Sequence, residues 1–308
     1  MNKTSISWTN LTSNPVYVTN SANKRGWLCT KVSQGCTHCY SETLNMRYGN
    51  KLFYNSISLK DVVWHLNNKE IAAWKLLKVP MKIFVCDMTD IFHERIPQNF
   101  VTQILDGMNQ APEQIFQILT KRPSRITEFR NNIPPNAWVG VSVEHNEYVN
   151  RIESLRRNYA GMKFISFEPL IGDIGKVDLT MISWIIIGGE SGTHHRPMNI
   201  EWARNLVRQA KEQGVAVWMK QLGGIRPGGN LEDFPEDLRI REFPAPLIKP
   251  KKIKPKLPRS GSSILRLSCL VFETYPLNFL RGPLLFRFTL SLYRGKLRSF
   301  SSSSTAFQ

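Results

Sequence analysis

The sequence has no long apolar run, and this absence argues against a helical membrane protein. The longest uncharged stretch, residues 4–23, is rich in Ser, Thr and Asn, whereas a membrane-spanning helix needs about twenty apolar residues. The first residues, Met1 to Trp8, also lack the apolar segment of a signal peptide. We therefore expect a cytoplasmic protein that makes no contact with a membrane.

Cysteine is scarce, and its distribution argues against a disulfide framework. The chain of 308 residues holds 5 cysteines, an odd number. Cys29, Cys36 and Cys39 fall within eleven residues, whereas Cys86 and Cys269 lie far away. An odd count with tight clustering favours metal ligation in a reducing cytoplasm over a secreted, cross-linked fold.

Motifs of several enzyme classes are missing. A zinc ribbon would need a second Cys-x2-Cys pair, and the chain has only Cys36 with Cys39. The glycine-rich segment 223–229 lacks the lysine of a phosphate-binding P-loop, so we interpret it as a flexible loop. No Ser-His-Asp or zinc-peptidase motif is present. These absences leave the clustered cysteines as the main chemical signal.

Acidic residues nearly disappear towards the C-terminus. Residues 247–308 hold 12 Lys and Arg against one acid, Glu273, a net charge of 12 − 1 = +11. Residues 1–246 hold 29 Lys and Arg against 23 acids, a net charge of 29 − 23 = +6. We expect residues 247–308 to be a basic, poorly ordered tail, with a nucleic-acid-binding arm as the alternative. The preceding chain divides into an irregular lead-in, residues 1–26, and one domain, residues 27–246.

The chain does contain an alternation of apolar strands and amphipathic helices. Buried strands are predicted at residues 82–86, 115–119, 138–142, 163–167, 183–187 and 215–219. Helices are predicted over 40–47 and 60–78, from Pro97, from Pro123, around 148–155 and over 200–213. An early strand near residues 26–29 would add a seventh. This alternation predicts an α/β fold with parallel strands, either a (βα) barrel or an open doubly wound sheet.

Charged residues follow the predicted strands at the same end of each. They are Asp87, Lys121, Glu144, Glu168, Glu190 and Lys220. Because the carboxyl ends of parallel strands meet at one edge of the sheet, these side chains predict a shared polar pocket. A single charged residue in such a position would be an ordinary solvated loop residue.

The cysteine loop, Cys29 to Tyr40, has the spacing C-x6-C-x2-C and allows three interpretations. Its thiolates could hold three irons of a [4Fe–4S] cluster and leave the fourth iron open. They could bind Zn²⁺, with His38, Cys86 or a distant residue as fourth ligand. They could also be plain buried cysteines. Three cysteines before a βα array, with no fourth nearby, favour the cluster.

The order of motifs resembles a phage- and mobile-element-associated family of uncharacterised three-cysteine-motif proteins, regarded as radical-SAM-like. The resemblance is carried by the cysteine loop and by residues 88–93, 116–123, 138–144, 167–170, 187–192 and 196–198. Radical S-adenosylmethionine enzymes usually space their cysteines as C-x3-C-x2-C, so this chain departs in the first gap. The resemblance implies a partial or full TIM-type (βα) barrel, a [4Fe–4S] cluster and S-adenosylmethionine.

The resemblance also implies roles for individual residues. The cluster ligands would be Cys29, Cys36 and Cys39. The candidate cofactor-binding residues at the strand ends are Asp87, Lys121, Ser142, Glu168, Gly188, Gly189 and Glu190. The implied partners are S-adenosylmethionine and an electron donor, with a nucleic acid or a partner protein as a further candidate. The alternative function is a zinc-stabilised nucleic-acid-binding or phage accessory protein without catalysis.

Purely structural interpretations stay open for some of these residues. Gly188 and Gly189 could form a tight turn. Glu168 and Pro169 could form a simple turn. Two further metal sites are less favoured, one at His194 and His195 and one at Asp87, Asp90 and His93.

Overall fold

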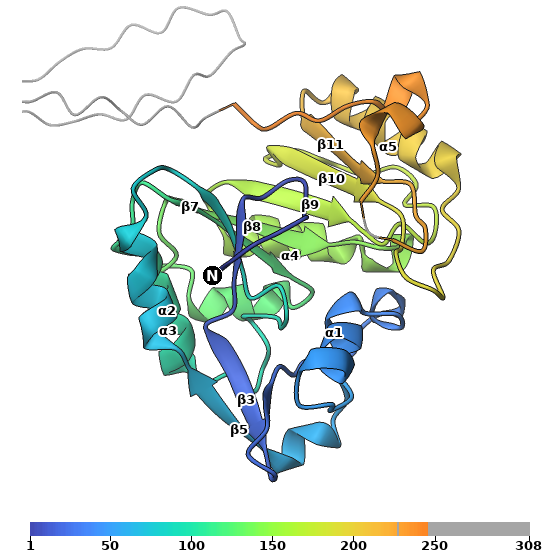
Figure 1. Ribbon diagram of the computed structural model, residues 1–308. Helices are drawn as coiled ribbons and strands as arrows, with labels where there is room; N and C mark the ends of the chain where they lie inside the picture. Colours follow the sequence, from blue (N-terminus) through green and yellow to red (C-terminus); the bar gives the residue numbers. More distant parts are fainter. Residues whose placement is uncertain (227, 246–308) are drawn as a thin grey trace, which may run out of the picture. The chain divides into compact units, whose positions relative to one another are not determined.

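The computed structural model describes residues 1–226 and 228–245 (Figure 1). The chain divides into two units, Met1–Ile248 and Lys249–Gln308. The predicted basic tail, residues 247–308, lies outside the described residues. Within the described ranges, no helix combines the length and the apolar character that crossing a bilayer requires.

The described chain contains eleven strands, five α-helices and seven short 3-10 helices. The strands are β1 (Asn2–Lys3), β2 (Leu11–Ser13), β3 (Val16–Asn20), β4 (Arg25–Gly26), β5 (Val62–Leu66), β6 (Lys82–Val85), β7 (Ile115–Thr120), β8 (Ala137–Ser142), β9 (Lys163–Phe167), β10 (Trp184–Gly188) and β11 (Ala216–Gln221). The α-helices are α1 (Tyr40–Tyr48), α2 (Asn68–Ala73), α3 (Gln98–Asn109), α4 (Asn150–Asn158) and α5 (Ile200–Glu212). The 3-10 helices are η1 (Gln34–Cys36), η2 (Ser58–Asp61), η3 (Trp74–Leu76), η4 (Pro123–Glu128), η5 (Asn146–Tyr148), η6 (Leu231–Asp233) and η7 (Glu236–Leu238).

The main sheet has eight strands in the order β1-β2-β6-β7-β8-β9-β10-β11. All neighbours pair in parallel except β1, which pairs antiparallel with β2. Figure 1 shows β7 to β11 following one another across the sheet in chain order. The six predicted strands and the α/β fold with parallel strands are therefore confirmed. A full barrel is wrong, because β1 and β11 end the sheet without pairing to each other.

The sheet is covered on one face by helices. Apolar residues of α3, α4 and α5 form one core with alternate residues of the strands, such as Ile118, Ile165 and Ile185. Asn199 begins α5, because its side chain accepts a hydrogen bond from the Glu201 amide at 3.0 Å. Helices on one face and a filled second face explain why the central strands are almost wholly apolar.

The second face of the sheet is filled by aromatic side chains, which we call the aromatic face. It consists of Trp8, Phe84, Met162, Phe164, Trp184, Ile186 and Trp218. The rings of Trp184 and Phe164 lie 5.6 Å apart, and those of Trp184 and Trp218 lie 6.2 Å apart at 83°. Because strand side chains alternate between faces, the residues two and four positions beyond these rings continue on the same face.

Two expectations for the N-terminal part are wrong. Residues 1–26 are not irregular, because β1 and β2 extend the main sheet and β3 and β4 belong to a second sheet. The helix predicted over 60–78 is replaced by β5 and the short α2. Val62, Trp64 and Leu66 pair antiparallel with β3, and pairing with a neighbouring strand overrides helical spacing.

The second sheet has the order β4-β3-β5 and lies beside α1 (Figure 1). Asn45 of α1 accepts a hydrogen bond from the Trp27 amide, just after β4, at 3.0 Å. The early strand expected near residues 26–29 is therefore β4, in this sheet and not in the main one. The segment from Pro123 forms only the 3-10 helix η4.

Candidate metal and cofactor site

The cysteine loop, residues 29–40, lies across the carboxyl ends of the parallel strands. Its residues contact side chains or backbone that follow β6, β7, β8 and β10. In parallel α/β folds the functional groups lie at this edge of the sheet. The loop and the charged strand ends therefore form one site.

Arg122, two residues after β7, anchors the beginning of the loop. Its guanidinium donates to the Thr30 carbonyl at 3.0 Å and to the Thr30 hydroxyl at 2.7 Å. It also lies 3.7 Å from the Cys29 sulfur. Asp90 and Glu94 accept from the same guanidinium at 3.3 and 2.8 Å. A fixed positive charge therefore stands beside the first thiol.

Glu144, after β8, anchors the middle of the loop. It is fully buried and accepts from Lys121 at 2.6 Å, from Arg151 at 2.7 Å and from the Ser33 hydroxyl. Burial acts to raise the pKa of Glu144, but Lys121 and Arg151 outweigh it and hold that pKa below its ordinary value. Gly35 packs so closely that an added Cβ would lie 2.4 Å from the Glu144 Cγ. The loop can approach this carboxylate only because residue 35 is glycine.

Glu190, after β10, anchors the end of the loop through His38. The His38 Nδ1 lies 3.1 Å from the Glu190 carboxylate. Arg196 donates to the same carboxylate from its backbone amide at 2.8 Å and from Nε at 2.9 Å, and it also reaches the Gln34 carbonyl at 3.1 Å. Burial acts to raise the pKa of Glu190, but the hydrogen bonds from Arg196 lower it to about 2. Glu190 is therefore an ionised structural partner of the loop.

Asp87, after β6, lies next to the end of the loop. The Tyr40 hydroxyl donates to the Asp87 carbonyl at 2.7 Å. The Asp87 carboxylate accepts from the Asn14 side chain at 2.6 Å. Burial raises the pKa of Asp87 to about 6, although the Asn14 hydrogen bond opposes the rise.

Glu168 and Lys220 form an ion pair at the ends of β9 and β11. Both continue the alternation of the aromatic face, four residues beyond Phe164 and two residues beyond Trp218. An added Cβ at Gly188 would lie 3.4 Å from Glu168, so glycine leaves room beside this carboxylate. The pair offers one carboxylate and one ammonium group at the edge of the sheet.

The three loop cysteines are free and partly buried. Burial raises the pKa of Cys29 to about 12, Arg122 opposes this rise, and the charges of Cys39 and Cys36 add to it. Burial likewise raises the pKa of Cys39, with a contribution from Cys36. Cys36 thus acts on the pKa of both other loop thiols. In residues 1–226 and 228–245, no group of three or more His, Cys, Asp or Glu side chains is arranged to hold a metal ion.

Other predicted site residues have structural roles. An added Cβ at Gly189 would lie 2.4 Å from the Leu222 carbonyl oxygen, so this glycine allows close packing against the chain after β11. Ser142 is buried, and its carbonyl accepts from Arg151 at 2.8 Å. Both ring nitrogens of His93 have partners, the Thr30 hydroxyl at 3.0 Å and the Arg95 amide at 3.1 Å. His93 is therefore committed to hydrogen bonds.

Sequence reasoning missed the partners of the buried carboxylates. Arg151 lies seven residues after Glu144 on α4, and Arg196 lies six residues after Glu190. A cation shortly after each strand-end carboxylate could have been noted from the sequence. The contact of Ser33 with Glu144 joins residues 111 positions apart, and no local pattern indicates it.

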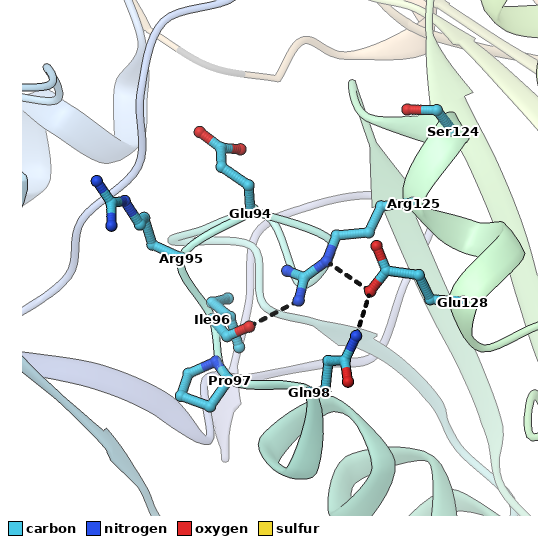
Figure 2. Close-up of a pocket in the computed structure, with 8 residues that line it drawn as sticks. All are labelled: Glu94, Arg95, Ile96, Pro97, Gln98, Ser124, Arg125 and Glu128. Carbon is cyan, nitrogen blue, oxygen red and sulfur yellow. Dashed lines mark hydrogen bonds and ion pairs between the residues drawn. The ribbon is translucent and has the colours of Figure 1, made fainter.

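A hollow of about 750 Å³ lies between the segment after β6 and η4. Its lining residues are Glu94, Arg95, Ile96, Pro97, Gln98, Ser124, Arg125 and Glu128 (Figure 2). Arg125 donates to the Ile96 carbonyl at 2.8 Å, and Glu128 accepts from Arg125 at 3.3 Å and from Gln98 at 3.1 Å. None of the loop cysteines lines this hollow, but Glu94 belongs both to its lining and to the ion pairs around Arg122.

Comparison with known proteins finds one family. The family model described as "Protein of unknown function (DUF5131)" matches residues 3–256. No curated protein and no solved structure matches the chain.

Proposed function

The chain belongs to the DUF5131 family of proteins of unknown function, and from its site we propose that it is an iron–sulfur enzyme of the radical S-adenosylmethionine type. The observation that carries the proposal is the position of the three-cysteine loop. The loop spans the carboxyl edge of a parallel sheet and is tied to residues after four of its strands. A metal centre held there would face the polar strand ends.

The topology supports a partial barrel of the kind that the cysteine motif implies. The parallel strands follow chain order from β2 to β11 without reversal, and the helices cover one face. A doubly wound sheet reverses its strand order and binds ligands in the crevice at the reversal. This sheet has no such crevice among the described strands, so a ligand would sit at the carboxyl edge, over the aromatic face.

The donor set supports a three-cysteine cluster more than a four-cysteine zinc site. The charges of Cys39 and Cys36 add to the raised pKa of Cys29, and the charge of Cys36 adds to that of Cys39. Cys86 is instead buried in the core between the sheet and its helices. Burial raises the pKa of its thiol, and the charges of Asp87, Glu70 and Asp90 add to the rise. The three loop thiols are therefore the proposed ligand set, and because the described residues do not hold them in a metal-binding arrangement, binding a cluster would require their sulfurs to move together. Such a set would leave one iron open to a ligand.

The strand-end residues suit a ligand with amino and carboxylate groups, as S-adenosylmethionine has. When bound, the cluster and this cofactor would supply reductive cleavage of a carbon–sulfur bond. Glu168 and Lys220 present opposite charges side by side and would bind an ammonium and a carboxylate. Gly188 leaves space next to Glu168. Asp87, with its raised pKa, would hold a proton near Tyr40 at mildly acidic pH.

The remaining proposed residues would act mainly by holding the loop. Lys121 and Glu190 already have charged partners, Glu144 and Arg196 respectively. Each pair fixes a part of the cysteine loop against a strand end. These residues would orient the thiolates and limit the entry of water.

Anaerobic reconstitution followed by iron, sulfide and zinc analysis tests the proposal. We expect about four irons and four sulfides per chain. Replacing Cys29, Cys36 or Cys39 by Ala should abolish the cluster. Cys86 lies in the core between the sheet and its helices, and Cys86→Ala should retain the cluster. Tight stoichiometric zinc without iron would instead support the zinc-stabilised, non-catalytic alternative.

A further inference from the structure

The positive charge of residues 1–246 is concentrated beside the cysteine loop. Residues 24–60 hold six Lys and Arg and one acid, Glu42, a net charge of 6 − 1 = +5. The rest of residues 1–246 holds 29 − 6 = 23 basic and 23 − 1 = 22 acidic residues, a net charge of only +1. Glu42 is itself paired with Lys31 at 2.8 Å. This 37-residue segment therefore accounts for most of the charge of that part of the chain.

The other cations of the segment are exposed and have no carboxylate partner among the described residues. They are Lys24, Arg25, Arg47, Lys51 and Lys60. Clustered, unneutralised cations form an electrostatic footprint for a polyanion.

Aromatic rings lie among these cations. Tyr40, Leu44 and Tyr48 are spaced four residues apart on α1 and are 45%, 38% and 68% exposed, so they form one apolar stripe along the helix. Phe53, beyond the end of α1, is 58% exposed. The Arg47 guanidinium lies 5.0 Å from the centre of the Tyr48 ring. Contiguous exposed apolar side chains that are rimmed by polar residues mark interaction sites.

The stripe begins at the candidate site. Tyr40 directly follows Cys39, and its hydroxyl donates to the Asp87 carbonyl at 2.7 Å. From there the stripe runs along α1 for about 12 Å, at 1.5 Å per residue. A molecule bound along α1 would therefore have one end at the cysteine loop (Figure 1).

We propose that this surface, defined by Tyr40, Arg47, Tyr48, Lys51 and Phe53, binds single-stranded nucleic acid. Cations contact the phosphates, and exposed rings stack on unpaired bases. A duplex keeps its base faces stacked inside and cannot use the rings, so the combination favours a single strand. Binding at this surface does not require the cluster, but its use as a substrate surface rests on the proposed function.

The test is a fluorescence titration of a labelled oligo-dT with the full chain, without reconstituted cluster, at several salt concentrations. Arg47→Ala with Lys51→Ala should weaken binding and reduce the slope of log affinity against log salt by about 1.4, at roughly 0.7 per lost phosphate contact. Tyr48→Leu keeps an apolar side chain but removes the ring. It should weaken binding about fivefold or more and leave the salt slope unchanged.

Matched controls separate this surface from general basicity. Lys176→Ala with Lys211→Ala removes the same charge from exposed positions outside the segment and should change neither affinity nor slope. Duplex DNA of the same length should bind more weakly. A parallel titration with an oligoribonucleotide shows whether the surface prefers RNA or DNA. Ultraviolet cross-linking of a bromouracil-substituted strand should label residues 40–53.

Three results would overturn the proposal. The first is an equal loss of binding in the control and the Arg47/Lys51 variants. The second is cross-linking confined to residues outside 24–60. The third is competition by polyglutamate as effective as that by oligo-dT, which would indicate an acidic protein partner. Because no cluster is used, none of these results depends on the proposed iron–sulfur chemistry.

Discussion

At the scale of residues, the strand-end carboxylates of the site differ in how their charge is balanced. Glu144 has Lys121 and Arg151, Glu168 has Lys220, and Glu190 has Arg196. Asp87 has only the neutral Asn14 side chain as a side-chain partner among the described residues. This difference explains why the pKa of Asp87 rises while those of Glu144 and Glu190 fall.

The raised pKa of Asp87 predicts a pH-dependent effect on stability. Its folded-state pKa, about 6, lies above the ordinary 3.8, so ionising the carboxyl costs free energy in the folded state. The free energy of unfolding therefore falls as the pH rises from about 4 to about 6. Asp87→Asn should remove this cost and gain about 2 kcal/mol relative to the wild type between pH 4 and pH 7.

Urea denaturation at the two pH values measures this gain. Asp106→Asn, at an exposed position on α3, serves as the control and should not reproduce it. A difference between Asp87→Asn and the wild type that is the same at pH 4 and pH 7 would contradict the assignment.

At the scale of elements, the cysteine loop is positioned by the strands rather than by its own structure. Between Cys29 and Cys39 its only regular part is the 3-10 helix η1, and its contacts reach Arg122, Glu144 and Glu190 on three different strand ends. The sequence predicted the strand ends, because apolar runs and the charges after them are local signals. It could not predict which loop residue meets which strand end, because those pairs are distant in the chain.

The close approach of Gly35 to Glu144 predicts a coupled pair of substitutions. Gly35→Ala should destabilise the fold by about 1–3 kcal/mol, because Glu144 is held by three partners and cannot easily move away. In a Glu144→Ala background the same change should cost clearly less, since the crowded side chain is gone. A double-mutant cycle by urea denaturation measures the coupling. Additive effects would show that residue 35 does not pack on Glu144 in solution.

The strand β5 shows where local patterns mislead. Val62, Val63 and Leu66 fit helical spacing, which predicts a helix over 60–78. In the fold, His65 stacks on Tyr17 of β3 with ring centres 4.9 Å apart, and the Thr19 hydroxyl lies 2.8 Å from the His65 Nε2. Such cross-strand pairs stabilise a strand but depend on a partner about 45 residues away.

At the scale of the described unit, the sequence predicted the class of the fold but not its closure. The βα alternation indicates parallel strands because helical crossovers join strands in that sense. A barrel closes only if its two edge strands pair with each other, and the residue pattern within one strand does not indicate such pairing. Here the sheet ends at β1, which runs antiparallel, and at β11. The aromatic face fills the side of the sheet opposite the helices, which in a closed barrel would be the interior.

The central claim is that the cysteine loop holds one cluster with an iron left open at the edge of the sheet. Electron paramagnetic resonance of the reconstituted, reduced chain, recorded with and without S-adenosylmethionine, tests it most directly. We predict a reduced-cluster signal that changes when S-adenosylmethionine is added, because the open iron gains new ligands, and that is absent from Cys36→Ala. A cluster signal that S-adenosylmethionine leaves unchanged, or a chain that retains zinc and takes up no iron, would contradict the claim.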